Sequence, residues 1–210
     1  MAHHLNRRHA LLGAAAILVG LLRPMRSAAA DADPAIAPIR AFYDALLAAM
    51  KQAEQLGVRG RYDKLAPVIR STFDLAAMTR IAVGPDWTTI PADQQATLLD
   101  SFARMTIATY ANRFDGFSGQ SFEIDPEVQP RNTGRIVRTK LVRPKEEPVT
   151  LNYLMRQGAS GSWQVIDVYL SGTISELATR RSEFGGVLQT SGADGLIKLI
   201  EDRAAALRTG

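Results

Sequence analysis

The chain has 210 residues, no cysteine and only three histidines, His3, His4 and His9. Beyond residue 9 it lacks both thiol and imidazole groups, which excludes nucleophile–base catalysis by cysteine or histidine and nearly all structural zinc sites. The chain carries 25 Lys and Arg and 21 Asp and Glu, and four of the arginines precede residue 31. Beyond that point 25 − 4 = 21 basic residues face 21 acidic ones. This neutral balance gives no support to nucleic-acid binding.

The N-terminal segment has the pattern of an export signal. Arg7 and Arg8 precede an apolar run, residues 10–22, and small residues follow up to Ala30, after which we predict cleavage. The run is thirteen residues long, shorter than the roughly 20 that span a membrane, so a cleaved signal fits better than an anchor. The arginine pair also resembles a twin-arginine motif, and both that route and the general secretory route stay open. We expect residues 31–210 to act in the periplasm as a single domain.

Helices dominate the first half of this expected domain. Ile36, Ile39 and Tyr43 begin a series of apolar residues at spacings of three and four, which predicts an amphipathic helix. Similar series follow, and glycine or proline marks where they stop or start. The expected helices cover residues 34–55, stopped by Gly57 and Gly60; residues 62–71; a third that Asp74 caps and Gly84-Pro85 ends; and a long one from Pro91 to near Gly116.

Beyond residue 116 the apolar period changes to two, which is typical of strands. Short turns between the apolar runs predict an antiparallel meander. Two helices follow: Thr173 and Glu176 form a candidate capping box for the first, and the last covers residues 192–207. The expected strands lie at residues 122–125, 135–142, 151–155 and 163–170.

Helices followed by an antiparallel sheet indicate an α+β fold. We predict a curved four-stranded antiparallel sheet, covered by the helical N-terminal half and the C-terminal helices, with an apolar cavity between the two layers. The apolar faces of both layers suit such a cavity, and they also suit an ordinary filled core. Periodicity alone favours the filled core.

An ordered set of short segments runs through the chain. The segments are Ser71–Met78, Val83-Gly84 with Trp87, Tyr110, Tyr153–Arg156, Trp163–Val168, Ser171-Gly172, Arg180–Phe184 and Gly195–Ile197. In this order they resemble the MlaC family of periplasmic phospholipid carriers, also called the toluene-tolerance family. The resemblance covers about residues 34–207. Within the family, residues 112–119 look more like the hopanoid-associated HpnM branch.

The resemblance implies a soluble, monomeric carrier rather than an enzyme, with no cofactor and no metal. One or more acyl chains of a phospholipid or hopanoid would lie in a dry pocket between sheet and helices. The carrier would exchange this lipid between an inner-membrane ABC transporter complex and an outer-membrane lipoprotein partner. Burial of each CH₂ group contributes about 0.8 kcal/mol, so a 16-carbon chain would gain up to roughly 12 kcal/mol.

Candidates for the pocket lining follow from the expected elements and the matching segments. They are Phe73, Met78, Tyr110, Leu141, Tyr153, Met155 and Val165. The flexible side chains of methionines suit cargo of varied shape, although methionine is also a good core filler. Arg180 and Arg181 are candidates for contact with a lipid head group or a partner protein, although exposed helix arginines are commonly only solvated.

Two other functional classes stay open. Asp167 occupies an apolar-looking strand position, two residues after Val165, and with Tyr153 it could form the carboxylate–tyrosine pair of a cavity isomerase. The structural alternative is that the Asp167 carboxylate pairs with an arginine or caps backbone groups. A protein-interaction domain, the other class, predicts a filled core without a cavity of about 300 Å³ or more.

Overall fold

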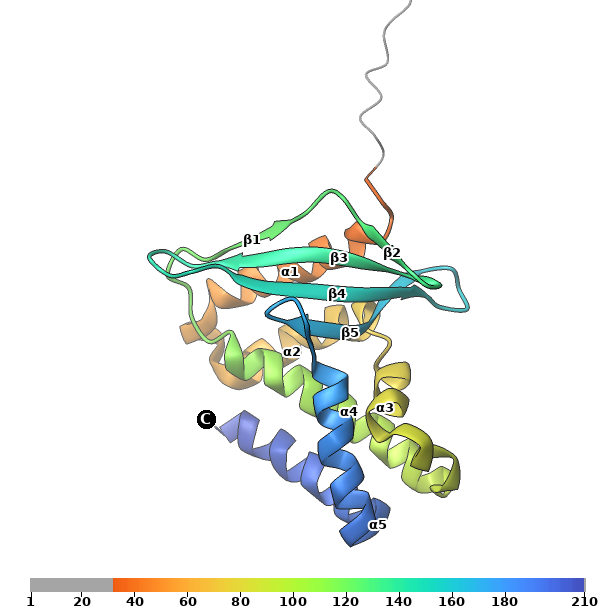
Figure 1. Ribbon diagram of the computed structural model, residues 1–210. Coiled ribbons are helices and arrows are strands. Elements are labelled where there is room, and N and C mark those ends of the chain that lie inside the picture. Colours follow the sequence, from red (N-terminus) through yellow and green to blue (C-terminus); the bar gives the residue numbers. More distant parts are fainter. Residues whose placement is uncertain (1–31, 210) are drawn as a thin grey trace, which may run out of the picture. The chain divides into compact units, whose positions relative to one another are not determined.

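An antiparallel sheet and five α-helices make up the part of the chain that this computed structural model describes, residues 32–209 (Figure 1). The predicted export signal lies outside the described residues, and the predicted α+β class is confirmed. The helices are α1 (Ile36–Met50), α2 (Ala53–Thr72), α3 (Leu75–Val83), α4 (Ala92–Arg113) and α5 (Glu176–Thr209), with a short 3-10 helix, η1 (Gly84–Thr89). The strands are β1 (Ser121–Ile124), β2 (Gln129–Arg131), β3 (Gly134–Val142), β4 (Val149–Gln157), β5 (Trp163–Leu170) and β6 (Ile174–Ser175).

The sheet has six strands within the described residues, where the sequence predicted four. Its order is β1-β3-β4-β5-β6, and β2 pairs with β3 on the same side as β1, so that β1 and β2 together form one edge. Strands β3, β4 and β5 are the predicted antiparallel meander. The two unpredicted strands, β2 and β6, have three and two residues, too few for an alternating pattern to show in the sequence.

A bulge interrupts the pairing of β4 with β5. Met155 lies opposite Val165, whereas its neighbour Leu154 lies opposite Asp167, so β5 contains one extra residue at this point. Because side chains alternate between the two faces of a strand, the extra residue reverses the alternation that follows it. Val168, which is buried, therefore takes the side that faces the helices in place of Asp167.

Glycines break two of the helices. The first helix ends earlier than predicted, at Met50, and α2 runs from Ala53 through Gly60 without stopping there. The predicted stop at Gly57 is a local break inside α2, where φ is 58° and ψ is −179°. Gly192 makes a similar break inside α5, with φ 63° and ψ −168°, at the position where the sequence predicted the start of the last helix. Both conformations have positive φ, which glycine adopts without steric cost.

The cap of α3 agrees with the prediction, and the cap of α5 does not. Asp74 Oδ1 accepts a hydrogen bond from the Ala77 N–H at 2.9 Å, which caps α3 as predicted. At α5 the predicted capping box that starts at Thr173 is wrong. The N-terminal side chain that caps α5 is that of Ser175, whose Oγ accepts a hydrogen bond from the Ala178 N–H at 2.9 Å.

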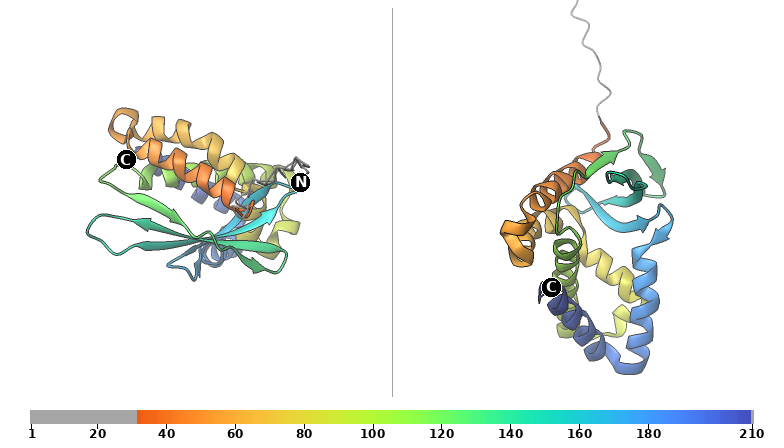
Figure 2. Two further views of the ribbon diagram at one scale, coloured as in Figure 1. Left: turned by 90° about the horizontal axis from the view of Figure 1, so that it is seen from above. Right: turned by 90° about the vertical axis from the view of Figure 1, so that its left-hand side faces the viewer.

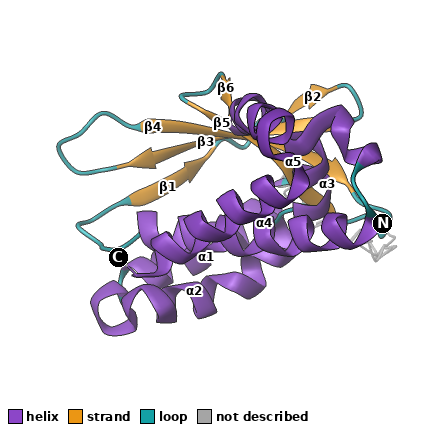
Figure 3. Cartoon of the chain, turned by 90° about the horizontal axis from the view of Figure 1, so that it is seen from below, coloured by secondary structure: helices purple, strands orange, loops and turns teal. Residues whose placement is uncertain are grey.

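The helices gather on one face of the sheet, as Figures 2 and 3 show. Helix α1 contacts β1, while α2, α3 and α5 contact β5. None of the helices in residues 32–209 combines the length and the apolar character that crossing a membrane requires. The hydrophobic core is rich in aromatic side chains and includes Phe42, Phe73, Phe102 and Phe184, none more than 1% exposed.

Candidate functional site

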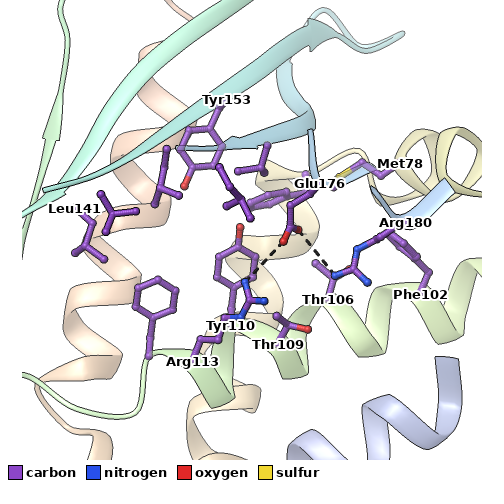
Figure 4. A pocket seen from close by; sticks show the side chains of 16 residues that line it. Met78, Phe102, Thr106, Thr109, Tyr110, Arg113, Leu141, Tyr153, Glu176 and Arg180 are labelled. Atoms are coloured by element: carbon purple, nitrogen blue, oxygen red, sulfur yellow. Dashed lines mark ion pairs between the residues drawn. The ribbon is translucent and has the colours of Figure 1, made fainter. Parts of the chain in front are cut away.

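A cavity of about 210 Å³ lies between the sheet and the helices (Figure 4). Strands β3, β4 and β5 form one wall of this cavity. Residues two apart on a strand share a face, and the wall follows that spacing along β4 and along the end of β5. The wall is apolar apart from one tyrosine hydroxyl, and it consists of Leu141, Val149, Leu151, Tyr153, Val168 and Leu170.

The opposite wall is largely aromatic. Helix α3 supplies Met78, α4 supplies Phe102 and Tyr110, and the residues that follow α2 and α4 are Phe73 and Phe114. The Tyr110 ring centroid lies 5.6 Å from that of Phe73 and 6.0 Å from that of Phe114. These separations are typical of favourable aromatic pairs, so the rings support one another as a continuous surface.

Three charged side chains stand at one end of the cavity. Arg113 ends α4, Glu176 begins α5, and Arg180 lies one turn further along α5. The Glu176 carboxylate lies between the two guanidinium groups, 3.7 Å from Arg113 Nη1 and 3.9 Å from Arg180 Nη2 (Figure 4). The Arg113 side chain is 60% exposed, whereas those of Glu176 and Arg180 are 24% and 18% exposed. The charged end of the cavity therefore meets solvent at Arg113.

A chain of buried hydroxyl groups lies beside the sheet wall, on the face of the sheet that the helices cover. The Tyr43 hydroxyl oxygen is 2.5 Å from Thr139 Oγ1 and 3.0 Å from the Tyr153 hydroxyl oxygen. Burial disfavours a phenolate, so it raises the pKa of Tyr43 to about 12 and raises the pKa of Tyr153 and of Tyr110 well above the ordinary value. All three phenols are neutral at pH 7, and within residues 32–209 the charged side chains on the cavity wall are those of Arg113, Glu176 and Arg180.

The structure brings five of the seven predicted lining residues to this cavity. They are Phe73, Met78, Tyr110, Leu141 and Tyr153. Met155 and Val165 are instead fully buried in the core, opposite each other on β4 and β5. The junction of α2 and α3 covers that end of the sheet, where the Asp74 N–H donates a hydrogen bond to the Val165 carbonyl oxygen at 2.9 Å. Helix packing thus fills the space that the sequence assigned to the pocket.

The two predicted head-group arginines lie apart. Arg180 lines the cavity, whereas Arg181 lines a separate groove together with Ile81. Sequence reasoning missed Arg113 and Glu176 as cavity residues. Glu176 and Arg180 are spaced four apart, which is the spacing of a helical ion pair and a usable signal. Arg113 had no such signal, because only the folded chain brings the end of α4 to the start of α5.

Asp167 lies outside the cavity. Its Oδ1 accepts hydrogen bonds from the N–H groups of Val168, at 2.8 Å, and Leu177, at 3.2 Å, and its Oδ2 accepts one from Ser175 Oγ at 2.6 Å. The carboxylate therefore joins β5 to the first turn of α5, which is the structural alternative considered from the sequence. The interpretation of Asp167 as the base of a cavity isomerase is wrong.

The lining indicates the kind of ligand more clearly than the volume does. At about 210 Å³ the cavity is smaller than the roughly 300 Å³ at which small-molecule sites begin, so volume alone does not exclude an interaction domain. An apolar cavity wall that ends at two guanidinium groups suits a ligand with a long apolar chain and an anionic head group. Among residues 32–209, no three His, Cys, Asp or Glu side chains are grouped so as to hold a metal ion.

Comparisons with known proteins agree with this geometry. The family model described as "MlaC protein" matches residues 40–202, a range that includes every residue of the cavity wall. Among solved structures, a phospholipid-binding protein from Ralstonia solanacearum, determined in complex with a phospholipid, matches with a TM-score of 0.72 and 25% sequence identity. The match covers 82% of this chain and 98% of that chain.

Proposed function

This chain belongs to the MlaC family, and we propose that it is a periplasmic protein that binds the acyl chains of a lipid in the cavity between sheet and helices. The observation that carries the proposal is the apolar cavity that opens toward solvent beside Arg113. A lipid would place its chains against the apolar walls and its head group at the charged end. The likeness to a protein determined with a phospholipid supports a phospholipid as the ligand.

Contacts with the acyl chains would come from five residues of the wall. Burial of each CH₂ group contributes about 0.8 kcal/mol, so even part of a 16-carbon chain supplies useful affinity without any polar contact. Met78 lines the cavity, and rotation of its flexible side chain would widen the cavity for longer chains. The proposed contacts are Phe73, Met78, Tyr110, Leu141 and Tyr153.

A lipid-binding protein of this kind would serve as a carrier. We propose that it shuttles a phospholipid or a hopanoid across the periplasm, between an inner-membrane ABC transporter complex and an outer-membrane lipoprotein. The export signal predicted in residues 1–30 and the family membership support this role. Arg181, which is exposed and outside the cavity, would be free to contact one of these partners.

Extraction of bound lipid tests the proposed function. The full chain is expressed in a bacterium with its own export signal, purified without detergent and extracted with organic solvent. Mass spectrometry is expected to find close to one lipid, or more, per protein molecule, and to identify the head group and the chains. Protein that is free of lipid, and that also fails to take up lipid from phosphatidylethanolamine–phosphatidylglycerol vesicles, would contradict the proposal.

A further inference from the structure

We infer that the loop between α4 and β1, residues 114–120, is a contact site for the surface of an anionic phospholipid bilayer, with Phe117 as the side chain that enters the bilayer interface. This inference goes beyond the proposed function, because it concerns the outer surface of the protein and not its cargo. Among residues 32–209, the large apolar side chains that stand exposed are Ile81, Phe117 and Ile174, and of these Phe117 is the aromatic one.

The loop is anchored on both sides of Phe117. Phe114 lines the cavity, and its ring centroid lies 6.2 Å from that of Phe122. On the other side Gly119 has φ 91°, and a Cβ placed there would lie 3.1 Å from Cγ of Pro144 in the turn between β3 and β4. Glycine suits both the positive φ and the close approach. Phe117 stands between these two fixed points and is 41% exposed.

The surroundings of Phe117 suit a lipid surface better than a protein partner. Its chain neighbours Gly116 and Ser118 carry no apolar side chain, whereas a stable protein interface covers about 800 Å² of each partner around a packed apolar centre. A single aromatic ring is too small for such an interface, but it can enter the boundary between lipid head groups and acyl chains on its own. Contact through one side chain is weak and reversible, which suits a protein that must leave the membrane again.

Basic side chains accompany the exposed ring. The Lys51 ammonium nitrogen lies 5.3 Å from the centre of the Phe117 ring, a cation–π contact. Arg113, four residues before Phe117, has a side chain that is 60% exposed. Asp115 is the acid of the loop, so these three charges leave a net charge of +1, because 2 − 1 = 1. Entry of the ring would bring both cations to the level of the lipid phosphates, where each strengthens the attraction to anionic lipids.

The loop also lies at the end of the cavity that meets solvent. Four residues of chain span at most about 14 Å, so Arg113, which lines that end, is within this distance of Phe117. The turn between α1 and α2, the turn between β3 and β4 and the C-terminal end of α4 lie at the same end of the two layers (Figures 1 and 3). A bilayer at Phe117 would therefore leave a lipid only a short path between membrane and cavity.

Binding to vesicles tests the inference. The protein is expressed with its own export signal, purified from the periplasm and mixed with sucrose-loaded phosphatidylethanolamine–phosphatidylglycerol vesicles, and sedimentation gives the partition coefficient. We expect Phe117→Ser to lower this coefficient about tenfold, the effect of one aromatic side chain no longer buried in the bilayer. Ile174→Ser, in β6 at the opposite edge of the sheet from β1, is the matched control and should change it less than about twofold. Equal effects of the two variants, or no effect of Phe117→Ser, would overturn the inference.

A fluorescent label at the same two positions gives a direct readout. Because the chain has no cysteine, Phe117→Cys and Ile174→Cys each provide a single thiol for the dye NBD, whose emission rises in an apolar environment. With the same vesicles, we expect the emission to increase about twofold or more at residue 117 and to stay unchanged at residue 174. No increase at residue 117, or the same increase at both positions, would show that the loop does not enter the bilayer.

Lysine variants test the contribution of charge. Lys51→Gln should lower binding to the phosphatidylglycerol-containing vesicles about threefold and leave binding to phosphatidylcholine vesicles unchanged. Lys198→Gln, which removes an exposed amine that pairs with Asp202 on α5, is the matched control and should have a smaller effect. Equal losses in the two variants would overturn the assignment of the loop as the face that meets the membrane.

The proposed function and this inference fail separately. Phe117→Ser should carry as much extractable lipid as the wild type, because Phe117 is not among the residues that line the cavity. A wild-type protein that carries lipid but does not bind the vesicles would overturn the inference and leave the carrier function intact. A protein that binds the vesicles through Phe117 but neither carries nor takes up lipid would support the inference and contradict the carrier function.

Discussion

Asp167 and Leu177 connect the sheet to the last helix: the Leu177 N–H donates a hydrogen bond to Asp167 Oδ1 at 3.2 Å. The carboxylate of Asp167 thereby stabilises the first turn of α5, from which Glu176 and Arg180 reach the cavity. The position of the charged cluster thus depends on a residue that does not line the cavity.

Replacing Asp167 should lower stability. Asp167→Ala leaves two backbone N–H groups and the Ser175 hydroxyl without their acceptor, and we expect the free energy of unfolding to fall by about 2–4 kcal/mol. Urea unfolding followed by circular dichroism measures the change. Asp202→Ala, which removes an exposed ion pair with Lys198, is the control and should cost less than about 1 kcal/mol. Equal effects of the two variants would disprove the capping role.

A large side chain at the sheet wall should exclude lipid. Leu141→Trp fills part of a cavity of about 210 Å³, so the protein purified with this change should carry much less lipid than the wild type. Val142→Trp is the matched control, because the next residue on β3 points to the opposite face of the sheet. Lipid extraction and mass spectrometry report both variants. A similar loss in Val142→Trp would mean that the cavity is not the binding site.

High pH should destabilise the fold through the buried tyrosines. Burial raises the pKa of Tyr43 from 10.0 to about 12, so this phenol is protonated in the folded chain and ionised in the unfolded chain between these values. The stabilisation is complete below pH 10 and is lost at about 1.4 kcal/mol per pH unit as the pH rises toward 12.

Tyr110 and Tyr153, whose pKa values are also raised by burial, add to this loss. Urea unfolding at a series of pH values measures the slope, and Tyr43→Phe should make it shallower by about one proton. Phenolate absorbance that develops around pH 10 in the native protein for all tyrosines would show that burial does not hold these groups neutral.

Two glycines of α5 should respond in opposite directions to alanine. Gly192 has φ 63° and ψ −168°, a conformation that is open essentially to glycine alone, so Gly192→Ala should destabilise the fold by about 1–3 kcal/mol. Gly186 lies within the helix, and an added Cβ there meets nothing within 4 Å, so Gly186→Ala should stabilise it by about 0.5–1 kcal/mol. The shift of the thermal midpoint measures each effect, and shifts of the same sign would refute the assigned break.

Much of the fold follows from local sequence patterns. The period of two in β3, β4 and β5 predicted the meander. It also correctly predicted that Leu141 and Tyr153 lie on the face of the sheet that lines the cavity. The same pattern failed at Asp167, because a bulge reverses alternation without leaving a mark in composition. Because of this one extra residue, Val168 and not Asp167 points to the side of β5 that faces the helices.

The extent of the cavity could not be predicted in the same way. Periodicity gives the face of a strand that is buried, but not which part of that face a helix covers closely. Met155 and Tyr153 share a face of β4, yet only Tyr153 lines the cavity, because the junction of α2 and α3 packs over the other end. The pairing of Arg113 with Glu176 joins residues far apart in the sequence and depends wholly on tertiary packing.

The two edge strands of the sheet present few free backbone groups with which a second molecule could pair. One edge is divided between β1 and β2, of four and three residues, and the other is β6, of two residues. Pro130 in β2 has no N–H with which to extend a ladder. Along the described sheet, a neighbouring chain would find only short rows of free backbone groups, which disfavours aggregation by strand addition. Such edges would suit the proposed carrier, which would have to remain dispersed while its apolar cavity is exposed between successive cargoes.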